Sequence, residues 1–321
     1  MPSAVPKVLR AVGLRSVYGL FSLIFISLVV FLADEVSPGD AATVMAGEKA
    51  TLKQVEQLRE QYGLNRAWPI RYLEFLGRAA TLDFGKSYFG TKRNVREMII
   101  EKLPLTAMLA FTGILIAIIV GISLGTIASI YRTRPPDTFI LIVSTLGVTV
   151  PTFVLAPTLV FIFATKMNYL PPTWEVNLRA PLWMYLILPV SILAARPAAL
   201  LTRVTRASMI ETMQQEFIRT AIAKGVPPGR LVLRHALRNA VLPVVTVIGT
   251  SFGFMLTGSF VLETVFTIPG IGQEGIDAIL QGDMPRIQGI VLMTGLMFLL
   301  LNLLVDILLP ILDPRIREAQ V

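Results

Sequence analysis

The chain has 321 residues, of which 54% are apolar and only 16% are charged. Soluble domains carry about 25% charged residues, so this composition excludes an ordinary soluble protein and points to a lipid bilayer. The formal net charge of +8 could suit a nucleic acid, but the Lys and Arg residues are distributed as in a membrane protein, so nucleic acid is excluded as a partner. The absence of cysteine excludes disulfides and thiolate metal sites.

Six apolar runs have the length that a membrane-crossing helix needs, roughly 20 residues. They occupy 17–33, 105–131, 139–165, 182–201, 241–261 and 290–309. Backbone polar groups must be satisfied inside lipid, and the runs lack the alternation of barrel strands. We therefore expect an all-α membrane protein with six transmembrane helices embedded in the lipid bilayer.

The positive charges predict the orientation of these helices. Lys7, Arg10 and Arg15 precede the first run as in a secretory signal, but the run is long for a signal and no convincing cleavage site follows, so we expect an uncleaved span. The short segments on one predicted side hold fifteen Lys and Arg residues, against three on the other. This bias predicts that both termini lie in the cytoplasm.

A sizeable insertion, residues 34–102, separates the first two runs on the predicted outer side. Thr51 and Gln54 match a capping box, and Gly63 supplies the stop of that helix. A second short helix is expected next, with three apolar residues on one face: Ile70, Leu73 and Leu76. Asn94 is placed to cap a third helix that leads into the second span. The insertion is therefore expected to be folded.

The second span carries small residues four apart, which lie along one helical face: Gly113, Ala117, Gly121 and Gly125. Such a stripe lets two membrane helices approach closely, either within this chain or between two subunits. Proline interrupts several later spans, where we expect kinks or local breaks: Pro151, Pro157, Pro189, Pro197 and Pro243.

The most informative stretch is the cytoplasmic loop 203–240, between the fourth and fifth spans. A short amphipathic helix is expected there, with four residues in an apolar stripe: Phe217, Ile218, Ala221 and Ile222. Glu216 near its start and Lys224 near its end suit the helix dipole, and Gly225 ends it. A second basic helix, 230–238, runs on into the fifth span. The short helix could be a lever for a soluble partner, or an interfacial helix attracted to anionic lipid.

Residues 219–225 read RTAIAKG and residues 234–243 read RHALRNAVLP. Together they resemble the coupling loop of ABC importer permeases, in the branch for dipeptides, oligopeptides and nickel. Further matches follow in order along almost the whole chain, at 37–40, 61–64, 83–88, 263–266, 269–272 and 312–315. Arg219 and Thr220 stand where the wider superfamily commonly has Glu-Ala, and the distance from Gly225 to Pro243 is longer; both features are similar to the peptide branch.

The resemblance implies a non-catalytic permease subunit of the type I ABC importer kind, in the bacterial or archaeal cytoplasmic membrane. It would move di- or oligopeptides; nickel complexes, sugars or another small solute are the alternative cargo. The implied partners are a second homologous permease subunit, two ATP-binding subunits and an extracytoplasmic solute-binding protein. This chain would hold no cofactor, because ATP and Mg would be bound by the partner subunits.

The resemblance also assigns roles to residues. The residues implied to couple to the ATPase are Glu216, Phe217, Ile218, Arg219, Ala221, Ile222, Lys224, Gly225, Arg234 and His235. Those implied to face the binding protein, or to form a gate, are Glu263, Pro269, Gly270 and Gly272. The expected organisation along the chain is a cytoplasmic N-terminus (1–16), a first transmembrane helix (17–33), the extracytoplasmic insertion (34–102), the permease core (103–309) and a cytoplasmic C-terminus (310–321).

Other sites find less support. Arg196 could line the pathway, or its side chain could extend to the cytoplasmic headgroups. His235 has no metal or nucleophile partner in the sequence pattern, and Gly85-Lys86-Ser87 only imitates a phosphate-binding loop, because Ala80 stands where that motif needs glycine. An intramembrane protease would need a histidine inside a span. A secondary transporter would need inverted repeats and intramembrane carboxylates for ion coupling, and Asp306 is the one residue that approaches such a carboxylate.

Overall fold

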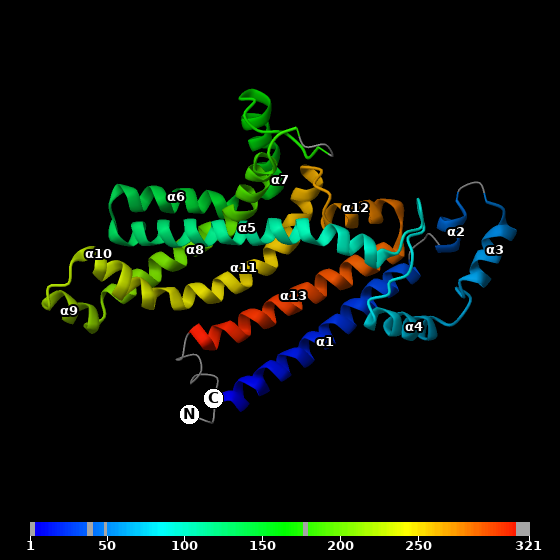
Figure 1. Cartoon of the computed structure of the whole chain (residues 1–321), viewed down its shortest axis with the longest axis horizontal. Coiled ribbons are helices and arrows are strands. Elements are labelled where there is room, and N and C mark those ends of the chain that lie inside the picture. Colours follow the sequence, from blue (N-terminus) through cyan, green and yellow to red (C-terminus); the bar gives the residue numbers. More distant parts are fainter. Residues whose placement is uncertain (1–3, 37–40, 48–49, 176–178, 313–321) are drawn as a thin grey trace. The chain divides into compact units, whose positions relative to one another are not determined.

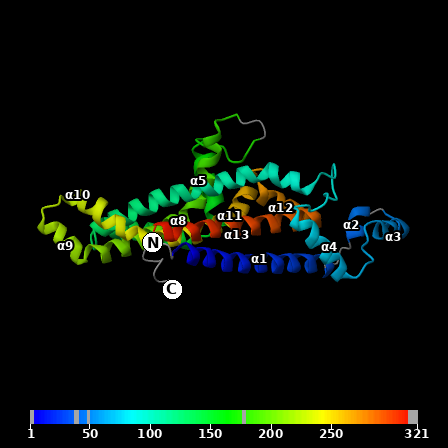
Figure 2. The same ribbon diagram turned by 60° about the horizontal axis from the view of Figure 1, so that its bottom comes forward.

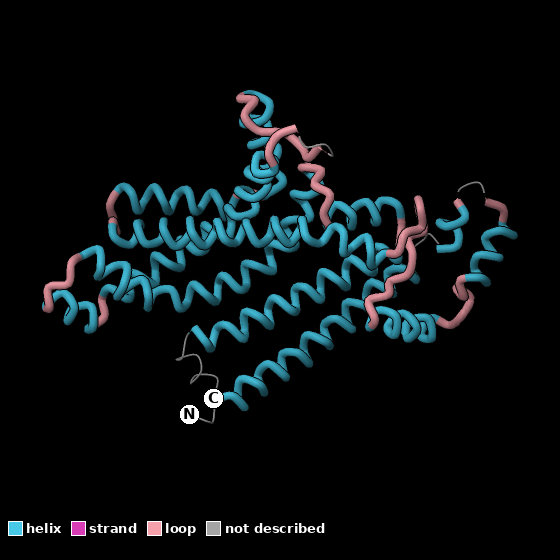
Figure 3. Tube along the Cα trace, in the orientation of Figure 1, coloured by secondary structure: helices cyan, strands magenta, loops and turns pink. Residues whose placement is uncertain are grey.

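The computed structural model describes residues 4–36, 41–47, 50–175 and 179–312, and these residues are mainly helical. Helices and loops make up the described chain, apart from one isolated antiparallel bridge between Lys86 and Asn94 (Figure 3). The matched segments 37–40 and 313–315, most of the expected C-terminal segment and the side chain of Asp306 lie outside the described residues.

The helices follow the chain in this order: α1 (Ala4–Val36), α2 (Ala41–Ala46), α3 (Leu52–Gln61), α4 (Trp68–Ala80), α5 (Val95–Ile130), α6 (Pro135–Thr149), α7 (Thr152–Leu159), the π-helical η1 (Val160–Lys166), α8 (Leu182–Met213), α9 (Glu216–Ala223), α10 (Pro228–Arg230), the π-helical η2 (Leu231–Ala236), α11 (Leu237–Val265), α12 (Ile271–Gln281) and α13 (Met284–Leu312). Among the described residues, five helices are long and apolar enough to cross a membrane, and the number is six if one bent pair counts as a span. The all-helical membrane fold class is confirmed.

The run 139–165 is not one straight helix. α6 and the α7–η1 segment meet at an angle of 107°. Pro151 begins α7, and the residue before it, Val150, is extended with φ −76° and ψ 120°. A residue that precedes proline is driven out of the helical region by the proline ring, which explains the break. The break expected at Pro151 is confirmed, whereas Pro189 and Pro197 lie inside the uninterrupted α8.

The chain divides into two compact units. The first contains residues 107–268 with short pieces from both ends of the chain. Within it α8 packs against α6 and α11 (Figure 1). Buried residues lie on most sides of α8, including Leu193, Leu201 and Met209. α8 is therefore the central helix of this unit.

The small-residue stripe of α5 faces α8 within the same chain. A Cβ atom added at Gly121 would lie 2.5 Å from the Leu201 Cβ, and one at Gly125 would lie 2.6 Å from the Thr202 carbonyl oxygen. Ala117 is fully buried. These distances leave no room for a larger side chain, so α5 and α8 are in direct backbone-to-backbone contact along the stripe.

The second unit contains residues 9–106 and 269–300. α1 and α13 run side by side in both views (Figures 1 and 2), and a Cβ at Gly295 of α13 would lie 3.1 Å from a Leu23 methyl group of α1. α4 is attached to α1 by a hydrogen bond of 2.9 Å between the Tyr72 and Ser27 hydroxyls, and by the rings of Phe31 and Phe75, whose centroids lie 6.0 Å apart.

Several local expectations can be compared with the second unit. The capping box of Thr51 and Gln54 is confirmed at the start of α3, and Gly63 follows its end with φ +66°. Asn94 accepts a hydrogen bond of 3.0 Å from the Arg96 N–H at the start of α5, as a cap should. The second short helix expected in the insertion is present as α4, and its buried side chain is Phe75. Ile70 and Leu73 are exposed, because the helix turns Phe75 and Tyr72 toward α1.

Candidate functional site

The short helix expected in the cytoplasmic loop is present as α9. Gln215 caps its start and Glu216 lies in its first turn, as the helix dipole favours. Lys224 is the C-cap, and Gly225 then adopts φ +73°. The left-handed conformation at Gly225 ends the helix without a steric cost, because glycine has no Cβ.

The four apolar residues of α9 divide between its two surroundings. Ile218 is fully buried and Ala221 is 8% exposed, whereas Phe217 is 43% and Ile222 57% exposed. Successive helical residues are about 100° apart, so Ile218 and Ala221 occupy the middle of the stripe and the other two its edges. Only the middle faces the protein. The edges leave two large apolar side chains uncovered in this chain.

Beneath α9 lies an apolar cluster that joins four elements. Ile218 and Ala221 pack with Met209 of α8, with Leu231 of η2 and, further along, with Ala236 and Ala240. Partly buried residues pack at its margin, among them Met213 at the end of α8 and Val226 between α9 and α10. The cluster, together with η2, which contacts α8, α9 and α11, therefore links α9 to both long helices.

The polar residues of α9 are on its outer side. Arg219 and Glu216 form an ion pair of 2.7 Å, with side chains 70% and 83% exposed. An exposed pair of this kind contributes little to stability, roughly 0 to 1 kcal/mol. Both charged side chains are therefore accessible to another molecule.

The second basic helix expected over 230–238 is α10, η2 and the start of α11. Its middle is π-helical, a form that appears frequently at functional sites. Arg234 is exposed and His235 half-buried in that segment, and the His235 carbonyl accepts a hydrogen bond of 2.9 Å from the Asn239 amide. Close by, a cavity of about 340 Å³ is lined by residues of α8 and η2 with the end of α5, including Met213, Leu231 and Ile130.

Replacing Gly225 with valine should destabilise the end of α9. A β-branched residue at φ +73° costs roughly 1–2 kcal/mol or more. No atom within 4 Å would be met by the new Cβ, so the effect is backbone strain and not a clash. Faster limited proteolysis after residues 223–226 would measure it. Gly229→Val, also with open space but without a positive φ, is the control; equal cleavage of the two variants would contradict the strain.

An ion pair that was not predicted connects α6 with α8. Arg206 donates two hydrogen bonds to the Asp137 carboxylate, at 2.6 and 2.7 Å, and the Thr133 N–H donates a third at 2.9 Å. Asp137 is only 3% exposed. The two residues are 69 positions apart, so no spacing in the sequence could have paired them.

Arg196 lies on the exposed side of α8, with its guanidinium 5.6 Å from the centre of the Phe254 ring of α11. This distance is within the range of a cation–π contact. The contact fixes the head of the side chain against α11 in this chain.

The four residues implied to face outward fall in two places. Glu263 is fully buried near the end of α11, in the first unit. The other three belong to the second unit: Pro269, Gly270 and Gly272. Gly270 is the N-cap of α12, and the Ile271 N–H donates a hydrogen bond of 2.9 Å to the Thr106 hydroxyl.

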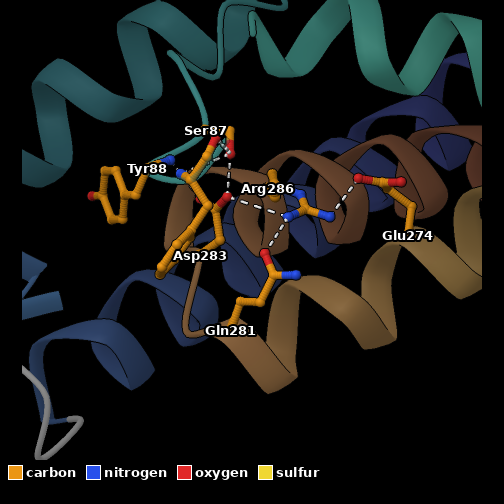
Figure 4. Close-up of polar contacts among 7 residues, drawn as sticks. Ser87, Tyr88, Glu274, Gln281, Asp283 and Arg286 are labelled. Carbon is orange, nitrogen blue, oxygen red and sulfur yellow. Dashed lines mark hydrogen bonds and ion pairs between the residues drawn. The ribbon is translucent and has the colours of Figure 1, made fainter. Parts of the chain in front are cut away.

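A buried polar network in the second unit centres on Asp283, which is fully buried between α12 and α13 (Figure 4). Its carboxylate accepts hydrogen bonds from the Ser87 hydroxyl and the Tyr88 N–H. Arg286 pairs with Asp283 and with Glu274, and donates to the Gln281 side chain. The matched segment 83–88 was the sequence signal for this site, but its distant partner could not be read from spacing.

Among the described residues, no group of three or more His, Asp or Glu side chains could hold a metal ion. The arrangement is one of packed helices with an uncovered apolar edge, not a catalytic centre. Comparison with known proteins identifies the family. Residues 113–318 match the description "Binding-protein-dependent transport system inner membrane component", and residues 8–110 match the N-terminal part of such components.

The chain belongs to this permease family. It is 37% identical over 305 residues to the glutathione transport system permease protein GsiC of Escherichia coli strain K12, covering 95% of this chain and 98% of that relative. The GsiC proteins of Shigella flexneri serotype 5b and Shigella boydii serotype 4 are 37% and 36% identical over the same coverage.

Family membership establishes the general role. The permease is a non-catalytic, multi-pass inner-membrane subunit of a binding-protein-dependent ABC importer. Subunits of this family carry no cofactor, and they work with an ATPase and a binding protein. The family assignment made from the coupling-loop residues is confirmed.

Proposed function

We propose that this permease moves di- or oligopeptides, and that α9 is the element through which a partner ATPase drives the movement. The observation that carries the proposal is the uncovered apolar edge of α9, Phe217 and Ile222, above a core that connects α9 to α8 and α11. Large apolar side chains that are exposed together on one surface mark interaction sites.

The remaining coupling residues have complementary roles in this proposal. Ile218 and Ala221 hold α9 on the chain, and Gly225 sets its end. Glu216, Arg219 and Lys224 are exposed charges that orient the partner, as is Arg234 on η2, and the half-buried His235 lies beside Arg234. Closure of the ATPase would then move α9, and the permease would switch between two states that differ in their affinity for the partner.

The proposed topology follows the charge bias. Both termini and the loop 203–240 lie in the cytoplasm, and residues 34–102 form a folded extracytoplasmic insertion. The attachment of α4 to α1 and of Ser87 to Asp283 supports a folded insertion. The binding protein approaches from this side, near the insertion and near Glu263, Pro269, Gly270 and Gly272. A second homologous permease subunit completes the passage, together with two ATP-binding subunits.

The peptide assignment is supported by relatives named for glutathione, which is itself a tripeptide. Nickel complexes, sugars or another small solute are the second candidate cargo, because the resemblance covers the branch that includes nickel systems. A reconstituted complex with its own binding protein would distinguish them. We expect di- to oligopeptides, and not nickel complexes or sugars, to raise ATP hydrolysis.

Coupling is tested by the double variant Phe217→Ala/Ile222→Ala. We expect binding-protein-stimulated ATP hydrolysis to fall at least about tenfold, since two hot-spot side chains are removed from the contact. Membrane insertion should be unchanged, because neither side chain is part of the buried cluster. The control is Val17→Ala/Phe21→Ala, which truncates two exposed side chains on α1. Full stimulation in the α9 variant would remove this edge from the coupling role.

A further inference from the structure

A cavity and a groove lie next to each other in the second unit and share a wall. The cavity, of about 310 Å³, is lined by α1, α4, the segment 84–92 and the start of α13. The groove, of about 360 Å³, is lined by deeper residues of the same three helices. Phe84, which is almost fully buried, belongs to both linings.

The two hollows follow the same helix faces. On α13 the cavity lining includes Gln288, and the groove lining begins one turn later at Leu292. On α1 the groove lining ends at Ser27, and the cavity lining begins one turn later at Phe31. One helical turn is about 5.4 Å, so cavity and groove are stacked along the spans. Along α1 and α13, the cavity lies near the ends of the candidate membrane spans and the groove lies nearer their middle.

The two hollows differ in chemistry. The groove is apolar apart from Ser27, whose hydroxyl is bonded to Tyr72: its lining is Leu20, Leu23, Ile24, Ser27, Leu76, Ala79, Ala80, Leu82, Phe84, Leu292, Met293 and Leu296. The cavity lining includes four cationic and two anionic side chains. A hollow that is cationic at the end of a span and apolar within the membrane matches an amphiphile with a negative head.

Three of the cavity cations are available to such a head. Arg71 is engaged by Glu35, and the carboxylate of Glu74 by Arg66. Within the described residues, no ion pair is formed by Arg78, Lys86 or Lys92, each of which is exposed. Burial raises the pKa of the Tyr88 phenol, which also lines the cavity. It therefore stays a hydrogen-bond donor at neutral pH.

We propose that the cavity and the groove together bind one anionic phospholipid, with its phosphate beside Arg78, Lys86 and Lys92 and one acyl chain in the groove. The α1, α4 and α13 helices would then be held together by the lipid as well as by their own contacts. A carboxylate of a protein partner could satisfy the cations, but it would leave the apolar groove without a role.

The test uses the full-length chain in phosphatidylcholine nanodiscs with increasing dioleoylphosphatidylglycerol, followed by native mass spectrometry of the retained lipid. We expect one retained phosphatidylglycerol per chain, with a preference over phosphatidylcholine on the order of a hundredfold from three cations. The variant Arg78→Gln/Lys86→Gln should lose roughly twenty-fivefold of that preference. The matched control Lys53→Gln/Arg96→Gln removes one lysine and one arginine that line neither hollow, and it should retain the preference.

The acyl chain is tested separately. Ala79→Trp fills the groove and should abolish retention of dioleoylphosphatidylglycerol, whereas Leu73→Trp, on the exposed side of α4, should not. On the unaltered chain, dihexanoylphosphatidylglycerol and glycerol phosphate should fail to displace the long-chain lipid. Equal retention of the two headgroups, a preference that survives in the Arg78 and Lys86 variant, or displacement by an acidic peptide at low concentration would each overturn the proposal.

Discussion

Replacing Arg206 with methionine is expected to lower the free energy of unfolding of the first unit by about 3–5 kcal/mol. The substitution leaves the Asp137 carboxylate almost fully buried, with only the Thr133 N–H to solvate it. An unpaired buried charge costs far more than the loss of an ordinary contact, because the low-polarity surroundings do not replace the missing hydrogen bonds. Unfolding in mixed micelles, followed by tryptophan fluorescence, would measure the loss.

The double variant Asp137→Leu/Arg206→Met separates the cost of leaving one charge buried and unpaired from the net contribution of the ion pair to the free energy of unfolding. Removing both charges should restore most of the lost stability, because no charge is left buried and unpaired. Arg203→Met is the matched control on the same helix; Arg203 makes one hydrogen bond of 2.9 Å, to Thr145 at an exposed position, and its loss should cost less than about 1 kcal/mol. A double variant as unstable as Arg206→Met would show that packing, not charge, explains the effect.

The second large effect is expected from Asp283→Ala. The substitution removes the acceptor for the Ser87 hydroxyl and the Tyr88 N–H, and it takes one of two carboxylates from the buried Arg286. The cost should be about 3 kcal/mol, concentrated in the segment 86–94 that Asp283 holds. Amide hydrogen exchange in this segment should therefore rise on the order of a hundredfold, while exchange in α8 is unchanged.

The matched control is Asp277→Ala, which removes a carboxylate six residues before Asp283, on α12. The hydrogen bonds that hold Ser87 and Tyr88 are made to Asp283 and not to Asp277. Its replacement should leave the exchange of 86–94 as in the unaltered chain. If both variants loosened the segment equally, the network around Asp283 would not be its anchor.

Much of the fold could be predicted because the bilayer constrains the sequence so strongly. The apolar runs predicted the spans, because every apolar residue in a run strengthens the same indication of a membrane-crossing helix. Local chemistry was also readable, as Thr51, Gln54 and Asn94 show, because a cap depends on residues only a few positions apart. The angle of 107° after α6 was beyond reach, because proline signals a break but not its direction.

Contacts between distant residues could not be read in this way. The pairing of Asp283 with Ser87 joins residues 196 positions apart, and nothing in either local sequence names its partner. The apolar stripe of α9 could be predicted, but its division into a buried middle and exposed edges could not. Periodicity shows which residues share a face of a helix, but it does not show how much of that face another element covers. The same reason applies to α4, whose apolar residues Ile70 and Leu73 could be placed on one face but not known to be exposed.

The division of the α9 stripe has a mechanical consequence. Phe217 and Ile222 stand about 140° apart around the helix axis, on either side of the line along which Ile218 and Ala221 are seated. A partner that bound both edges would hold the helix from two sides and prevent it from rolling on its seat. A force on such a partner would then reach the cluster beneath α9 through Ile218 and Ala221.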